Sequence, residues 1–129
     1  PNLKIVITGI VNHEHILNYY RLADIMVFPS THDGCPNAFL ESMLAGCPIL
    51  CSRSGAMGDI VDESSCGKSI SNPDAIQLSY HIKEMLINKE ATQKMGDNGK
   101  KYILTNLSPQ RETEIWNSCY KKLLGNIYE

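Results

Sequence analysis

The sequence lacks any long hydrophobic stretch, because its uninterrupted apolar runs reach no more than about five residues. A helix that crosses a bilayer needs about 20 apolar residues, so no membrane-spanning segment is predicted. The first residues lead directly into an apolar run without a basic segment before it, and we expect no signal peptide. The formal net charge is −2 and no block of lysine and arginine occurs. These absences argue against a nucleic-acid-binding protein.

The cysteines do not form an even set that could pair completely. There are five, at Cys35, Cys47, Cys51, Cys66 and Cys119. In a reducing compartment such thiols behave as small buried apolar groups, whereas a small secreted domain uses paired cysteines. We therefore expect a cytoplasmic protein, with peripheral contact at the inner face of the membrane left open.

Short apolar segments rich in β-branched residues alternate with helical patterns. Buried parallel strands are predicted at residues 3–10, 25–28, 48–51 and 67–71, and helices at 13–23 and 36–45. From residue 73 onward the pattern is helical, with Asn72 as the expected N-cap, interruptions at Gly96 and Gly99, and a last helix that begins at residue 108. The sequence therefore predicts one α/β domain over residues 1–129, a Rossmann-like parallel sheet flanked by helices with a helical tail over about 73–129.

Residues 28–41 hold the candidate functional groups, because a predicted strand ends there and a helix begins across a polar loop. Ligands of open α/β sheets bind at the carboxyl ends of the strands. The backbone N–H groups of Asn37 and Ala38 fall in the first helical turn, where they lack acceptors and favour a phosphate. Gly34 has no Cβ and allows a ligand to approach the loop closely.

Two carboxylates lie on either side of this predicted phosphate site. Asp33 comes just before the helix, and Glu41 lies four residues beyond Asn37, on the same helix face. Carboxylates accept paired hydrogen bonds from vicinal hydroxyl groups, so the arrangement suits a nucleotide sugar. The alternative is that Asp33 caps the helix and Glu41 is a solvated helix residue.

Residues 23–30, 33–50 and 55–61 together closely resemble one known domain. It is the nucleotide-sugar-binding domain of the retaining GT-B-fold glycosyltransferases, the glycosyl transferases group 1 family. The resemblance extends over nearly the whole chain. It implies the second half of the C-terminal donor-binding domain, truncated, with the diphosphate-binding Arg and Lys and the acceptor-binding domain lying upstream.

The resemblance also implies a role for each candidate residue. Asp33 and Glu41 form the catalytic pair, in which Glu41 holds the ribose hydroxyls and Asp33 contacts the donor sugar. The diphosphate meets the amides of Asn37 and Ala38, and the base lies along a strand that ends in Gly9 and Val11. The implied donor-binding set is Gly9, Val11, Gly34, Cys35, Asn37, Ala38 and Glu41. No metal site and no cofactor beyond the nucleotide diphosphate sugar is implied, and the acceptor is a carbohydrate or glycolipid of a surface polysaccharide pathway.

Two departures from the family pattern keep other functions open. The first acidic residue is usually Glu and here is Asp33, and the usual Gly-Gly-x-Pro-Glu loop is replaced by residues 54–59. The chain alone could therefore be a nucleotide-binding module without catalysis, or a remnant with a degenerate site. Arg53 is either a positive charge for the diphosphate or a solvated loop residue. Trp116, Tyr120 and Tyr128 recur at helical spacing and are expected to pack.

Overall fold

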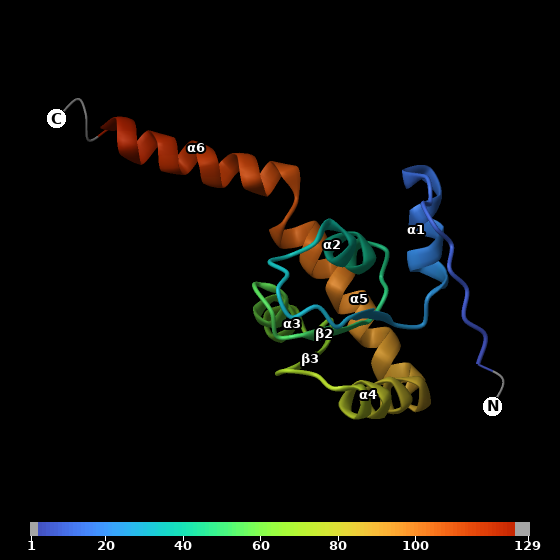
Figure 1. The fold of residues 1–129 in the computed structure, drawn as a ribbon. Coiled ribbons are helices and arrows are strands. Elements are labelled where there is room, and N and C mark those ends of the chain that lie inside the picture. The colour runs from blue at the N-terminus through green and yellow to red at the C-terminus, as the bar shows by residue number, and fades with distance from the viewer. Residues whose placement is uncertain (1–2, 126–129) are drawn as a thin grey trace.

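A computed structural model describes residues 3–125 of the chain. Its helices and strands follow in the order α1 (His13–Leu22), β1 (Met26–Phe28), α2 (Asn37–Leu44), β2 (Ile49–Ser52), α3 (Met57–Ser64), β3 (Gly67–Ile70), α4 (Ala75–Ile87), α5 (Lys89–Asn106) and α6 (Pro109–Gly125) (Figure 1). The end of the expected helical tail, residues 126–129 with Tyr128 among them, lies outside the described part of the chain.

The three strands form one parallel sheet in the order β1-β2-β3. In its register, Val27 lies beside Leu50 and Leu50 lies beside Lys68. All four residues of the middle strand β2 are buried, as is typical of a parallel strand covered on both faces. The α/β fold class predicted from the sequence is confirmed.

Side chains of β2 alternate between two core clusters, because successive residues of a strand point to opposite faces. The larger cluster consists of Phe39, Met43, Ile49, Cys51, Met57, Val61 and Cys66. The smaller cluster consists of Leu50, Ile70 and Met85. Accordingly α2 and α4 lie on opposite faces of the sheet (Figure 1). This packing fixes α2 at the carboxyl end of β1, where the candidate residues begin.

The strand predicted at residues 3–10 is wrong. This segment has no strand conformation and runs alongside α1 at the outer edge of the molecule (Figure 1). Its apolar side chains are exposed, with Ile7 at 91% and Ile10 at 104% of full accessibility. A strand needs hydrogen bonds to a neighbour, and within residues 3–125 the sheet contains only β1, β2 and β3. Strand propensity alone therefore does not determine whether residues 3–10 form a strand.

The predicted interruption at Gly96 and Gly99 is also wrong, because α5 continues through both residues. Both glycines are buried at close crossings. A Cβ on Gly96 would lie 2.1 Å from the carbonyl oxygen of Gly46, and one on Gly99 would lie 2.9 Å from the Cβ of Cys66. Glycine disfavours a helix by about 1 kcal/mol, and here close packing outweighs that cost.

Two further differences concern α3 and α4. The sequence prediction left out α3, although its apolar residues Met57, Ile60 and Val61 have helical spacing. The N-cap of α4 is Asp74, whose carboxylate accepts from the Gln77 N–H at 2.7 Å, and not Asn72. Asp74 can cap because its short side chain reaches the free N–H groups of the first turn.

Helix α6 extends away from the sheet (Figure 1). The packing predicted for Trp116 and Tyr120 is therefore wrong for the described residues, since these side chains are 55% and 56% exposed and stack on each other. None of the helices within residues 3–125 combines the length and apolar character that crossing a bilayer requires.

Candidate functional site

The candidate site is built from two loops that follow neighbouring parallel strands. Residues 29–36 connect β1 to α2, and residues 53–56 connect β2 to α3. Since both strands end at the same edge of the sheet, the two loops meet there. Ser52, the last residue of β2, donates a hydrogen bond from Oγ to the carbonyl oxygen of Ser30. This edge is the one at which ligands of open α/β sheets bind.

The first turn of α2 has free backbone donors. Its N-cap is Pro36, which provides no side-chain hydrogen bond. The N–H groups of Asn37 and Ala38 consequently lack acceptors within the helix, and the helix dipole is positive there. Phe39 anchors this turn, because its ring is fully buried and contacts Phe28 of β1 edge-to-face, with ring centroids 5.6 Å apart. The turn is therefore held rigidly with donors suited to an anion.

Glu41 lies one turn inside α2 and is half-buried. Its Oε2 accepts a hydrogen bond from the hydroxyl of Tyr20 on α1, at 3.3 Å. The Tyr20 side chain is only 6% exposed. Burial raises the pKa of Tyr20, and the nearby Glu41 carboxylate raises that pKa further. Glu41 is thus held by a buried partner, which is not the situation of a freely solvated helix residue.

Asp33 is half-buried and precedes the N-cap of α2 by three residues. The alternative in which it caps this helix is not what the structure shows, since the N-cap is Pro36 and no side chain caps the helix. Its backbone is instead held by Ser54, whose hydroxyl accepts from the Asp33 N–H at 3.2 Å and donates to the Asp33 carbonyl at 3.0 Å.

The two predicted loop residues after Asp33 differ in their surroundings. Gly34 is exposed, and a Cβ added to it would have no neighbour within 4 Å. Its surface is therefore open to a ligand. Cys35 is half-buried and packs against the larger core cluster. Burial, and then the charge of Asp33, raise the pKa of its thiol, so the side chain acts as a packing group.

Gly9 and Val11 are not part of a strand. They belong to the segment before α1, where Gly9 is exposed with a φ of +65° and Val11 is half-buried. No hydrogen bond between described residues joins either of them to Asp33 or Glu41. Of the predicted set, the residues from 33 to 41 lie in the β1–α2 connection and the first turns of α2, whereas Gly9 and Val11 lie in the segment before α1.

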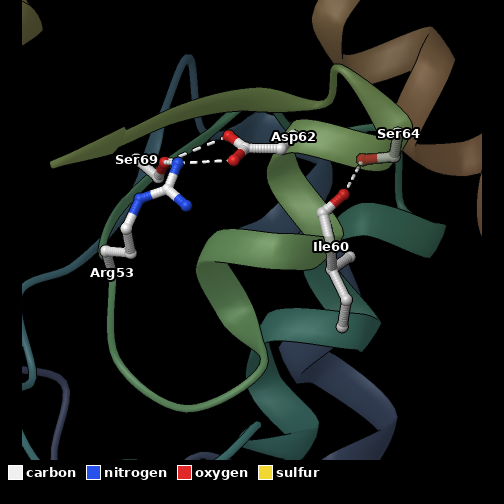
Figure 2. Close-up of polar contacts among 5 residues, drawn as sticks. All are labelled: Arg53, Ile60, Asp62, Ser64 and Ser69. Atoms are coloured by element: carbon white, nitrogen blue, oxygen red, sulfur yellow. Dashed lines mark hydrogen bonds and ion pairs between the residues drawn. The ribbon is translucent and has the colours of Figure 1, made fainter.

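Arg53 follows β2 but its guanidinium turns toward α3 and β3. Nη2 contacts the Asp62 carboxylate at 2.5 Å and the Ser69 hydroxyl at 3.1 Å (Figure 2). Its pKa is raised by the hydrogen bond and charge of Asp62. The Cα of Gly58 lies against this side chain, since an added Cβ would be 2.6 Å from the Arg53 Cγ. Arg53 is thus used in an ion pair beside β3.

Sequence reasoning missed Tyr20, which donates a hydrogen bond to the Glu41 carboxylate, and Ser54, which bonds to the backbone of Asp33. Both are separated from their partners by 21 residues in the chain, and no local pattern predicts contacts at that distance. The glycine at position 55 is a partial signal in the sequence, because glycine is favoured where the chain turns sharply. Its φ of +52° shows that the chain does turn there, beside Ser54.

Comparison with known proteins gives a consistent assignment. A sequence model of the family described as Glycosyl transferases group 1 matches residues 2–102. The chain is 24% identical over 118 residues to MMP alpha-(1->4)-mannosyltransferase of Mycolicibacterium hassiacum, covering 91% of this chain and 29% of that protein. It spans less than a third of the length of the curated relatives that it matches first.

Two solved structures share the fold. Sucrose-phosphate synthase of Thermosynechococcus elongatus superposes with a TM-score of 0.81 at 23% identity, over 92% of this chain and 30% of that one. The C-terminal domain of a group 1 family glycosyl transferase of Francisella tularensis superposes with a TM-score of 0.70 at 22% identity. The superposition covers 80% of this chain and 53% of that domain's chain. The expected GT-B C-terminal fold is confirmed. Because the family match extends over residues 2–102, the chain belongs to the glycosyl transferases group 1 family.

Proposed function

We propose that this chain forms the donor side of a glycosyltransferase that uses a nucleotide diphosphate sugar. The observation that carries the proposal is the uncapped first turn of α2 between Asp33 and Glu41 at the carboxyl edge of the sheet. A diphosphate needs hydrogen-bond donors and positive potential, which the amides of this turn supply. The hydroxyl-rich groups at the two ends of the donor need acceptors, which the carboxylates supply.

The two carboxylates would divide the donor between them. Glu41 is oriented by Tyr20 and would accept hydrogen bonds from the ribose hydroxyls. Asp33 would contact the donor sugar, and the amides of Asn37 and Ala38 would stabilise the charge on the diphosphate as it leaves. The open surface of Gly34 supports close approach of the ligand to this loop.

In the transfer itself, the bond between the anomeric carbon and the diphosphate breaks and the acceptor oxygen bonds to that carbon. The acceptor proton would pass to the leaving diphosphate with retention of configuration, and this reaction needs no further cofactor. The acceptor would be a carbohydrate or a glycolipid, bound by parts of the protein beyond these 129 residues. A hexose donor is supported by the mannosyltransferase named among the relatives.

The test measures the affinity for nucleoside diphosphate by calorimetry in the full-length protein. Glu41→Ala is expected to weaken binding by about 1.5–3 kcal/mol, the range for hydrogen bonds to a charged group. Asp33→Ala is expected to lower sugar transfer strongly while product nucleotide binding stays nearly intact. The matched control is Glu63→Ala, because Glu63 also accepts a hydrogen bond from a tyrosine, the Tyr102 hydroxyl at 2.8 Å, but lies on α3.

Unchanged nucleotide affinity in Glu41→Ala would contradict the proposed role of this edge of the sheet. Equal losses of nucleotide affinity in Asp33→Ala and Glu41→Ala would contradict the division between sugar and ribose. A protein that binds nucleotide sugar normally but transfers nothing to any carbohydrate or glycolipid would instead be a nucleotide-binding module.

A further inference from the structure

The loop between β2 and α3 holds three backbone polar groups of Asp33 and Gly34 by hydrogen bonds. Ser54 uses one hydroxyl as both donor and acceptor, toward the carbonyl and the N–H of Asp33. Ala56 donates its N–H to the carbonyl of Gly34 at 2.8 Å. We call residues 54–56 the clamp. It satisfies three backbone polar groups of a loop that belongs to neither a helix nor a strand.

Gly55 makes the clamp tight. A Cβ at this position would lie 2.2 Å from the Gly34 carbonyl oxygen and 2.6 Å from that of Asp33. Its φ of +52° is also in the left-handed region, which favours glycine. The two loops therefore touch through their backbones, and the Asp33 loop has no room to move toward α3.

The clamp acts on the backbone of Asp33 and leaves its carboxylate free. No hydrogen bond or ion pair of the Asp33 carboxylate occurs within residues 3–125. An aspartate has one side-chain torsion fewer than a glutamate between backbone and carboxyl group. The position of its oxygens is therefore set more directly by the position of its backbone, and a shift of the loop moves the carboxylate with it.

We propose that Ser54 is a positioning residue that fixes Asp33 for recognition of the donor sugar. This inference rests on the proposed function of Asp33 and assigns the sugar preference of the site partly to the loop after β2. Loss of the Ser54 hydroxyl should displace Asp33, while the Tyr20–Glu41 pair and the first turn of α2 stay unchanged.

The experiment compares four single variants of the full-length protein, one of which is the Asp33→Ala variant introduced above. Ser54→Ala removes the hydroxyl, and Ser54→Thr retains it. Ser64→Ala is the matched control, because the Ser64 hydroxyl likewise donates to one carbonyl, that of Ile60 (Figure 2), and accepts from one N–H, that of Cys66. This control removes an equivalent pair of bonds at the end of α3.

The first measurement is amide hydrogen exchange without ligand. Ser54→Ala should speed exchange at the Asp33 N–H, and Ser64→Ala should speed it at the Cys66 N–H instead. The second measurement compares the affinity for a sugar nucleotide with the affinity for its nucleoside diphosphate. Two pairs are measured, GDP-mannose with GDP and UDP-glucose with UDP, and the variants are evaluated on the pair that the unchanged protein binds more tightly. Ser54→Ala should weaken binding of the sugar nucleotide about fivefold to tenfold, the equivalent of about one hydrogen bond. Nucleoside diphosphate binding should change less than about twofold.

The sugar preference is the ratio of the affinity for the sugar nucleotide to the affinity for the nucleoside diphosphate. Ser54→Thr should retain most of this ratio, and Ser64→Ala should leave it unchanged. Unchanged exchange at Asp33 in Ser54→Ala overturns the clamp. A faster exchange with an unchanged sugar preference, in a protein whose Asp33→Ala variant loses that preference, overturns the positioning role alone. If Asp33→Ala also keeps the preference, or if neither nucleotide pair binds, the proposed function is wrong and this inference falls with it.

Discussion

The hydrogen bond between Tyr20 and Glu41 joins α1 to α2 at the candidate site. The tyrosine ring on α1 is buried, and its hydroxyl reaches a carboxylate on α2. A hydroxyl donor fixes the direction of the carboxylate and leaves its remaining lone pairs available. Glu41 can therefore be oriented by the protein and still accept from a ligand.

Tyr20→Phe tests this orientation directly. The ring keeps its packing and only the hydroxyl is lost, so the free energy of unfolding should fall by about 0.5–1.5 kcal/mol. Nucleoside diphosphate affinity should weaken by less than in Glu41→Ala, because the carboxylate remains but loses its partner. Calorimetry and urea unfolding of the full-length protein measure both effects.

The control is Tyr102→Phe, which removes the hydroxyl that donates to Glu63 on α3. This variant should lose similar stability and bind nucleotide normally. Identical nucleotide affinity in Tyr20→Phe and the unchanged protein would show that Tyr20 does not orient Glu41.

At the scale of the secondary-structure elements, α5 owes its place to two glycines. Gly96 allows the helix axis to approach the turn at Gly46, and Gly99 allows it to approach Cys66. Helix α5 consequently packs closely on α2, the helix that carries Glu41. A residue that weakens a helix by propensity is here the one that permits its packing.

Gly96→Ala should therefore destabilise the protein although alanine is the better helix former. Its Cβ would overlap the Gly46 carbonyl, and overpacking of this kind typically costs about 1–3 kcal/mol. Thermal and urea unfolding measure the loss. Lys101→Ala, at an exposed position of the same helix, should change stability by no more than about 0.5 kcal/mol. A more stable Gly96→Ala variant would mean that propensity outweighs the contact.

At the scale of the whole molecule, the ionisation of the buried cysteines depends on whether the core is folded. Cys47, Cys51 and Cys66 are buried, whereas Cys119 on α6 is exposed. Burial raises the pKa of Cys47 to about 11 and that of Cys51 to about 12, from an ordinary 9.0. In the unfolded chain these thiols ionise near pH 9, while the folded protein keeps them protonated.

Stability should consequently decrease as the pH rises above about 9. Between pH 9 and about 11 to 12 the folded state binds more protons than the unfolded state, so raising the pH favours unfolding. Urea unfolding at a series of pH values measures the slope. Cys51→Ala should reduce that slope and Cys119→Ala should leave it unchanged. An equal slope in both variants would contradict the assignment to buried thiols.

The sequence by itself determined the parts of this protein that depend on neighbouring residues. The alternation of strands and helices from residue 13 to residue 70 predicted α1, β1, α2, β2 and β3, because periodicity and turn chemistry are local. The same reasoning located Asp33, Glu41 and the first turn of α2 at the carboxyl end of a strand, since these residues lie within one segment of the chain. The family resemblance followed from the same segment.

Only the tertiary structure decided what depends on residues far apart in the chain. Residues 3–10 have strand propensity but no hydrogen-bonding neighbour within the part that the structure describes, so they form no strand. Helix α5 has a glycine at position 96 because the carbonyl group of Gly46, in the turn between α2 and β2, occupies the space where a side chain would lie. Tyr20 and Ser54 reach Glu41 and Asp33 across 21 residues. Such contacts depend on how the sheet and helices pack, which no local pattern contains.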